Sequence, residues 1–421
     1  MPASFILNGF DMRRAAVIFL VLYAFAVPWE YALDLGEPLG NIARILNVLT
    51  LLVCVPCVVE AGRIRRPGAL LCLVFALYMF FVCSFFWTVD VITTFGKIRS
   101  YIQVMMSVWL IWELVETPEQ LRDLLRAFVG GCWVLAALTF VNFTTASSIV
   151  TGQTRFAAEG QDPNDVARFL DLGMPFAALL FTSESRLILR LAAIFYIPAG
   201  LLAVLLTASR GGFSASLAAL AGSAVLLGVW KPKRASIILS ISTIFAGLLW
   251  LVVPQSTMDR LGTIPEQLAS SDLNDRLNIW IAGWHAFARE PWFGHGAGTY
   301  AFASGLSEGD TAHNTLMAML VTGGVFGAAL FLACIVSVAW YVSQTKGLLR
   351  IALVTTLIVW AITAMVGSVE ENRATWLLLG WMAAAGRLAS NPALATLFGG
   401  HPKLIRRSAL WDARLDSANS P

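Results

Sequence analysis

The stretch AAVIFLVLYAFAVPWEYAL (residues 15–33) is an almost unbroken run of apolar side chains near the start of the chain. A helix needs about 20 such residues to cross a hydrocarbon layer of about 30 Å, so this run has the length of a membrane span. Similar runs recur along the 421 residues, of which 58% are hydrophobic and 13% charged. A soluble domain has too little interior to bury that much apolar surface. The sequence therefore predicts an all-α, polytopic integral membrane protein.

Length and hydropathy together predict about twelve transmembrane helices. They are expected at residues 15–33, 41–60, 68–87, 91–114, 121–142, 165–182, 187–207, 211–230, 235–253, 312–341, 347–368 and 373–389.

These spans divide a single membrane domain into four parts. Residues 1–253 form an N-terminal region of nine spans, and residues 254–311 form one large polar loop. Residues 312–390 hold three further spans, and residues 391–421 form a polar tail with basic clusters.

The distribution of basic residues predicts the orientation, because short cytoplasmic loops are rich in lysine and arginine. With the N-terminus inside, 19 of the 29 basic residues lie on the cytoplasmic side, the tail returns to that side, and the large loop lies outside. A single basic residue at the outer end of a span usually extends to the interface, whereas several on one face would form an anion site. Ten basic residues break the rule: Arg44, Lys97, Arg99, Arg155, Arg168, Arg210, Arg260, Arg276, Arg289 and Arg373.

The motif TASRGGF (residues 207–213) places one of these arginines, Arg210, in a turn between two predicted spans. This orientation puts Arg210 on the outer face, where it is misplaced for topology and is expected to bind a ligand. The structural alternative is an ion pair, in which Glu370 and Glu371 would be the partners of Arg210 or Arg276.

The large loop contains SDLNDRLNIWIAGWHAFAREPWFGHGAGTY (residues 271–300), in which apolar positions recur at helical spacing until Pro291 and Gly294 end the pattern. The pattern predicts an amphipathic helix on the outer face, with Trp280 and Trp284 at headgroup level. Arg276 begins this helix beside Asp275, and a helix start is a poor place for a cation unless it faces an anion. The glycine-rich GHGAGTY that follows has no preceding strand, which favours tight turns over a phosphate-binding loop.

His313 and Asn314 stand at the outer mouth of the next predicted span. A histidine has an unperturbed pKa of about 6.5, which suits a general base near neutral pH. The alternative is a histidine that only caps the helix entrance. Asp310 or Asn314 could orient the ring, or could themselves be caps.

Lys97 and Arg99 lie one turn inside the predicted span 91–114, where a basic residue is costly unless it is paired or functional. A salt bridge to Glu30 or Asp34 is the structural alternative.

Two other motifs raise the question of a metal or redox site. QDPND (residues 161–165) offers carboxylates, but the same residues are ordinary turn and helix-cap chemistry, which we favour. Cys54 and Cys57 form a CxxC inside an apolar run, which favours buried small residues over a redox or metal pair. The sequence shows no signature of nucleic-acid binding.

Taken in order, TASRGGF, DRLNIWIAGW, PWFGHGAGTY and AHNTLMAMLVTGGVFG resemble the O-antigen ligase and O-antigen polymerase superfamily. VPWEYALDLGEPLGNIARILN and RFAAEGQDPNDVARFLDLGMPFA are similar to its exopolysaccharide-associated members. The resemblance implies a glycosyltransferase-C-like membrane enzyme of lipopolysaccharide or exopolysaccharide biosynthesis. Such enzymes use an undecaprenyl-diphosphate-linked glycan at the periplasmic face of the inner membrane, with no metal or other cofactor.

The resemblance also implies roles for individual residues. Arg210 and Arg276 match arginines expected to bind the diphosphate, and His313 matches the catalytic histidine of an inverting transfer. Asn314, Asp275, Lys97 and Arg99 are expected to be supporting residues. The acceptor would be lipid A core in a ligase or a second lipid-linked glycan in a polymerase. A transporter or flippase of lipid-linked glycans is the alternative, although no repeated halves are evident.

Overall fold

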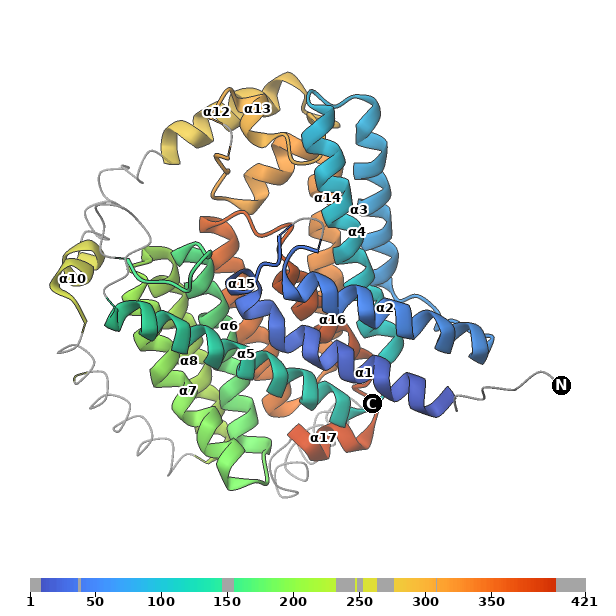
Figure 1. Ribbon diagram of the computed structural model, residues 1–421, viewed down its shortest axis with the longest axis vertical. Coiled ribbons are helices and arrows are strands. Elements are labelled where there is room, and N and C mark those ends of the chain that lie inside the picture. The colour runs from blue at the N-terminus through green and yellow to red at the C-terminus, as the bar shows by residue number, and fades with distance from the viewer. Residues whose placement is uncertain are drawn as a thin grey trace, which may run out of the picture.

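The computed structural model describes residues 9–36, 39–145, 155–231, 247, 253–262, 276–307 and 309–398. Across these residues the regular structure is helical, apart from one isolated β-bridge between Asp34 and Asn41 (Figure 1). The predicted all-α architecture is confirmed.

Seventeen helical segments follow one another along the described parts of the chain. They are α1 (Gly9–Ala26), η1 (Val27–Ala32), α2 (Ile42–Ala61), α3 (Ala69–Cys83), η2 (Ser84–Phe86), α4 (Val91–Leu114), α5 (Pro118–Thr144), α6 (Pro163–Ser183), α7 (Leu187–Leu206), α8 (Arg210–Trp230), α10 (Gln255–Gly262), α12 (Arg276–Arg289), α13 (Tyr300–Ser304), α14 (Thr315–Gln344), α15 (Gly347–Val366), α16 (Arg373–Arg387) and α17 (Pro392–Phe398).

Within the described parts of the chain, nine helices are long and apolar enough to cross a membrane. They are α1 continued by η1, α2, α3 continued by η2, α5, α6, α7, α8, α14 and α15. The polytopic prediction is therefore supported, while the count of twelve stays a prediction. The expected span 235–253 lies almost wholly outside the described residues.

Two of the predicted spans form helices that are not among these nine. Helix α4 has the expected bounds but carries Lys97, Arg99 and Gln103 among its apolar residues. Helix α16 has only 15 residues, or about 22 Å at 1.5 Å per residue, and nearly all of them are buried. It is therefore an inner helix of the bundle, packed against α4 and α14.

Helix α6 lies at the centre of the bundle, where it contacts α5, α7, α8 and α15 (Figure 1). Its residues from Val166 to Leu180 are all buried, including the charged Arg168 and Asp171. Gly173 permits close packing on α7, because a Cβ there would lie 2.6 Å from the Tyr196 hydroxyl oxygen. The same hydroxyl donates to the Leu170 carbonyl oxygen at 2.8 Å, and this hydrogen bond joins α7 to α6.

Helices α12 and α13 lie over the first half of α14, at the end of the molecule shown at the top of Figure 1. A separate hydrophobic cluster, which includes Ala286, Tyr300 and Val321, joins the three helices. Gly294, Gly296 and Gly298 all have positive φ angles (68°, 106° and 74°). They allow the chain after α12 to turn tightly against its neighbours, which confirms tight turning as the role of GHGAGTY.

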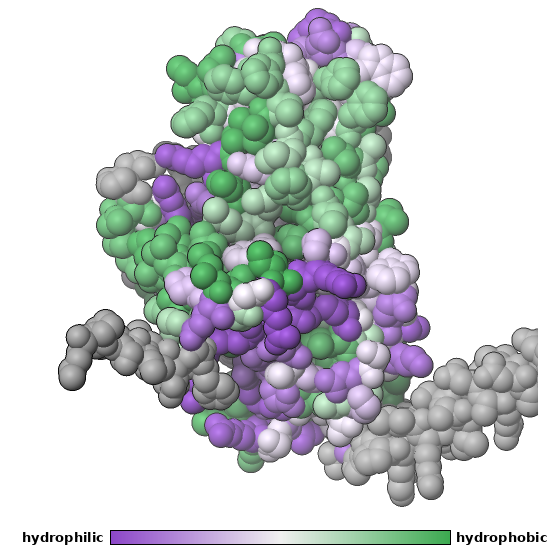
Figure 2. Space-filling model, turned by 90° about the vertical axis from the view of Figure 1, so that its right-hand side faces the viewer, coloured by the Kyte–Doolittle hydropathy of each residue, from purple (hydrophilic) through white to green (hydrophobic). Residues whose placement is uncertain are grey.

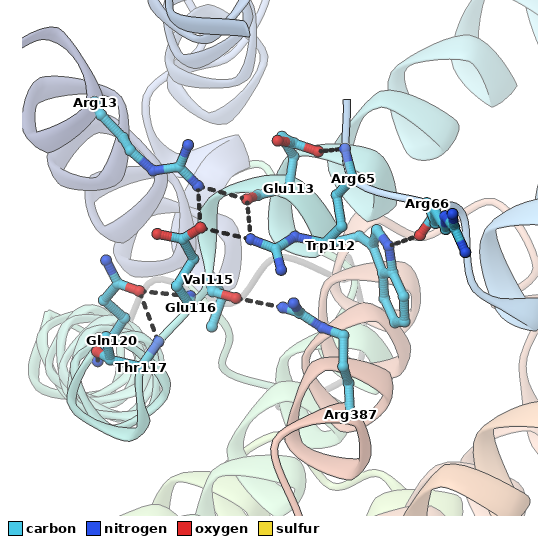
Figure 3. Close-up of polar contacts among 10 residues, drawn as sticks. All are labelled: Arg13, Arg65, Arg66, Trp112, Glu113, Val115, Glu116, Thr117, Gln120 and Arg387. Carbon is cyan, nitrogen blue, oxygen red and sulfur yellow. Dashed lines mark hydrogen bonds and ion pairs between the residues drawn. The ribbon is translucent and has the colours of Figure 1, made fainter. Parts of the chain in front are cut away.

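A charged cluster lies at the far end of the bundle from α12 (Figure 3). Arg13 and Arg65 both pair with Glu116, at 2.8 and 2.6 Å, and Arg387 donates to the Val115 carbonyl oxygen. The structure thus gathers basic residues that were expected on the cytoplasmic side.

Figure 2 shows that one side of the molecule has a largely hydrophobic upper part above a hydrophilic lower part. Large apolar side chains are exposed on several helical segments, for example Phe86 on η2, Ile92 on α4 and Val336 on α14. A continuous exposed apolar surface of this kind suits contact with lipid.

Cys54 and Cys57 are buried in α2, as expected for small packing residues.

Candidate functional site

The candidate site is built around the turn that precedes α8. Ser209 caps this helix, and its hydroxyl accepts a hydrogen bond from the Gly212 N–H at 3.2 Å. A Cβ at Gly212 would lie 2.4 Å from the Ala167 side chain, and one at Gly211 would lie 2.6 Å from that of Val366. The two glycines after Arg210 therefore let the start of α8 press against α6 and the end of α15.

QDPND fixes this turn from the side of α6. Asp162 caps α6, and its carboxylate accepts from the Asn164 N–H at 2.7 Å, which confirms the helix-cap interpretation. The Asn164 side-chain oxygen then accepts from the Ser209 hydroxyl at 2.8 Å and from Arg155 Nη2 at 3.1 Å. The motif thus cross-links two helix starts and orients an arginine between them.

Several arginines converge on the same turn. Arg155 Nε donates to the Thr207 carbonyl oxygen at 3.0 Å, and Arg260 Nε donates to the Ala208 carbonyl oxygen at 3.1 Å. Burial lowers the pKa of Arg155 to about 10, and repulsion from Arg260, Arg210 and Arg276 adds to this shift. The pKa values of Arg260 and Arg276 are also lowered by burial. The site is therefore strongly cationic.

A pocket opens beside the start of α8, between α6, α12 and α15. Arg168 and Arg276 contribute its cationic side chains, and Asp165 contributes a carboxylate. The remaining lining residues are Asn164, Ser209, Gly211, Gly212, Thr363, Val366 and Gly367. Two guanidinium groups beside the N-terminus of a helix are suited to bind an anion.

His313 lies next to this cationic group, just before α14. Its backbone is left-handed (φ 47°), and Ala208 beside Arg210 is also left-handed (φ 51°). Such conformations in residues other than glycine cost energy and cluster at functional sites. Trp280 of α12 donates from its indole N–H to the Ala312 carbonyl oxygen at 2.8 Å, which ties α12 to the chain beside His313.

Two effects lower the pKa of His313 below its usual value of 6.5. Burial is the larger, and the nearby positive charge of Arg276 is the next; Asp162, Asp165 and Asp310 oppose them. The imidazole is consequently neutral at neutral pH and able to accept a proton.

Asn314 and Asp310 each accept a hydrogen bond from a nearby backbone N–H. Asn314 caps α14, where its side-chain oxygen accepts from the Met317 N–H at 3.0 Å. Its amide nitrogen donates to the Met365 carbonyl oxygen at 3.3 Å, which joins the start of α14 to the end of α15. Asp310 accepts from the Ser307 N–H at 3.0 Å. Asn314 is thus a helix cap, whereas Asp310 makes a contact within the loop and also acts electrostatically on His313.

Lys97 and Arg99, which were also expected to be supporting residues, are not among the residues that line the pocket. The sequence suggested Glu30 or Asp34 as a salt-bridge partner for Lys97. In the structure Lys97 pairs instead with Glu371, at 2.5 Å. Glu30 instead pairs with Arg373 at 2.6 Å.

Arg99 is exposed on α4. Asp275 lies outside the described residues. Arg276 lines the pocket and acts electrostatically on His313, and Arg210 and Arg276 both act on Arg155. Arg210 and His313 are not among the residues that line the pocket.

Sequence reasoning did not assign Arg155, Arg168 and Arg260 to the site. All three are among the ten basic residues that break the topology rule. Their unusual place at the outer ends of the spans was the signal in the sequence that could have pointed to the site. Only the packing of the helices shows which of the ten basic residues lie close together.

Fold and site together define a polytopic helical membrane protein with a cationic pocket and a neutral histidine at one end of its bundle. Residues 191–332 match the sequence model of a family described as O-antigen ligase. The matched region contains Arg210, Arg276 and His313, and it confirms the resemblance to the O-antigen ligase and polymerase superfamily. It supports a function of that type in glycan biosynthesis. No curated protein matches the sequence significantly.

Proposed function

We propose that this protein is a membrane glycosyltransferase that moves a glycan from undecaprenyl diphosphate to a hydroxyl acceptor at the periplasmic face of the inner membrane. The acceptor is lipid A core, as in an O-antigen ligase, or a second lipid-linked glycan, as in a polymerase. The family match over residues 191–332 supports the reaction class.

The observation that carries the proposal is the convergence of cationic side chains with one neutral histidine. Arg210 and Arg276 both act electrostatically on Arg155, and Arg276 also acts on His313. A polyprenyl diphosphate holds its negative charge at the membrane surface while its tail stays in lipid. Guanidinium groups match phosphate oxygens in charge and in geometry, so the cluster suits that headgroup.

In the proposed reaction, an acceptor hydroxyl attacks the anomeric carbon of the donor sugar. His313 takes the hydroxyl proton as the new carbon–oxygen bond forms. The bond from the anomeric carbon to the diphosphate oxygen breaks, and undecaprenyl diphosphate leaves with the electron pair. Arg210 and Arg276 stabilise the departing negative charge. One direct displacement of this kind inverts the anomeric centre and needs no metal.

The proposed orientation places both termini in the cytoplasm and the site in the periplasm. The charged cluster of Arg13, Arg65 and Arg387 supports it, since it lies at the opposite end of the bundle from α12. An excess of arginine and lysine marks the cytoplasmic ends of membrane helices.

The test is transfer by purified protein supplied with lipid-linked glycan, with and without lipid A core, in the presence of a chelator. Product that forms only with the core identifies a ligase, and longer lipid-linked glycan without it identifies a polymerase. Arg210→Ala should lower kcat/KM by about 100-fold or more, because it removes a charge that stabilises the leaving group. Movement of donor between leaflets without any new glycosidic bond would show a transporter instead.

A further inference from the structure

Arg168 is a buried charge to which the proposed reaction assigns no role. It lies near the start of α6, and only 5% of its side chain is exposed. Its Nη1 pairs with the Asp165 carboxylate at 2.9 Å. Its Nε and Nη2 are both buried and have no hydrogen-bond partner within the described parts of the chain.

These two nitrogens lie along one edge of the planar guanidinium group. That edge donates two parallel hydrogen bonds to a carboxylate or a phosphate. Arg126 uses the same edge within this protein, where its Nε and Nη2 donate to the two Glu184 carboxylate oxygens at 2.6 and 2.7 Å. A buried edge left without a partner costs free energy, so the Arg168 edge is suited to a ligand with two acceptor oxygens.

The surroundings of this edge select an anion. Arg168 lines the pocket beside α8 together with Arg276 and with Ser209, Gly211 and Gly212 at the start of that helix. The helix start adds a positive partial charge. Asp165 is the acidic residue among the lining side chains, and its charge is balanced by Arg168 itself.

We propose that this pocket binds one phosphate group of the carrier diphosphate, and that Arg168 holds it through the Nε–Nη2 edge. This inference rests on the proposed function for the identity of the carrier. Arg168 stands on the buried central helix α6 and supplies a fixed contact, while Arg276 supplies a second contact from α12.

The test is direct binding to the purified full-length protein, measured separately for inorganic pyrophosphate and for undecaprenyl diphosphate in nanodiscs. Arg168→Gln should weaken both affinities by about 10- to 100-fold, since it removes a pair of charge-assisted hydrogen bonds. Arg168→Lys keeps the charge beside Asp165 but cannot donate two parallel bonds, so it should give an intermediate loss. Arg126→Lys is the matched control and should leave both affinities at the wild-type value.

The outcomes separate the pocket from the proposed reaction. Unchanged affinity of folded Arg168→Gln for both ligands overturns the inference, even if wild-type protein transfers glycan. Weakened binding of pyrophosphate with unchanged binding of the lipid also overturns it, because the pocket would then hold a free anion. Weakened binding of both supports it, and the proposed reaction fails separately if wild-type protein then transfers no glycan.

Discussion

At the scale of single residues, the site depends on how neighbouring charges set one another's protonation. Burial and Arg276 hold the pKa of His313 below 6.5. A general base must be unprotonated to act, so this shift widens the pH range in which His313 can accept a proton. Arg276, which we propose binds the leaving group, would thus also help to keep the proposed base unprotonated.

The pH dependence of transfer follows from this coupling. In the wild type, kcat/KM should fall only below pH 6.5, as His313 becomes protonated. Arg276→Gln removes a nearby positive charge, so the pKa of His313 rises and the acidic limb moves to higher pH. The measurement is a pH–rate profile, with Arg276→Lys as the charge-retaining control. An acidic limb at the same pH in the wild type and Arg276→Gln would contradict this account.

At the scale of elements, the site depends on close approaches between helices. Gly211 and Gly212 bring the start of α8 against α15 and α6, and Trp280 holds α12 beside the chain that carries His313. The two glycines therefore set where α8 begins, beside Arg210, and one hydrogen bond sets how α12 lies beside His313.

Gly212→Ala tests the close approach. The added methyl group would lie 2.4 Å from the Ala167 side chain, so α8 must shift. Overpacking of this kind costs about 1–3 kcal/mol of stability and should also lower transfer. Gly228→Ala in the same helix is the control, because nothing lies within 4 Å of its new Cβ. Thermal unfolding in detergent measures both, and equal melting temperatures for the two variants would count against the packing argument.

Trp280→Phe tests the attachment of α12. The variant loses the hydrogen bond to the Ala312 carbonyl oxygen, worth about 1 kcal/mol, and should lower kcat/KM by about fivefold to tenfold. Trp284→Phe on the same helix is the control, since that side chain is exposed. Loss of activity in the control alone would disprove the anchoring role.

The local elements were predictable from the sequence, and their convergence was not. The apolar spacing around Trp280 and Trp284 predicts the observed α12, because helical periodicity is a local property. The hydrogen bond between Asn164 and Ser209 depends on how α6 packs against α8, which no local pattern contains. Whether the buried helix α16 is a span stays a prediction, because an apolar run alone does not distinguish a short buried helix from a membrane-crossing one.

At the scale of the whole molecule, the two ends of the bundle differ in chemistry. One end carries the charged cluster around Glu116, and the other carries α12, His313 and the cationic pocket. In the proposed orientation the donor reaches the pocket from the outer leaflet, while the charged cluster faces the cytoplasm.

Cysteine labelling tests this orientation. Ser307→Cys, between α13 and α14, should react with a membrane-impermeant maleimide in intact spheroplasts. Ala395→Cys, on α17, should react only after the membrane is permeabilised. Wild-type protein gives the background from its own six cysteines. The reverse pattern would refute a periplasmic site.

The central claim is that His313 performs the chemical step while the arginines bind the diphosphate. The most direct measurement compares His313→Ala with the wild type in two assays on the same purified protein, glycan transfer and undecaprenyl diphosphate binding. The account predicts that binding is retained while kcat falls by about 100- to 10,000-fold, the usual contribution of a general base. Transfer by His313→Ala at the wild-type rate would contradict it.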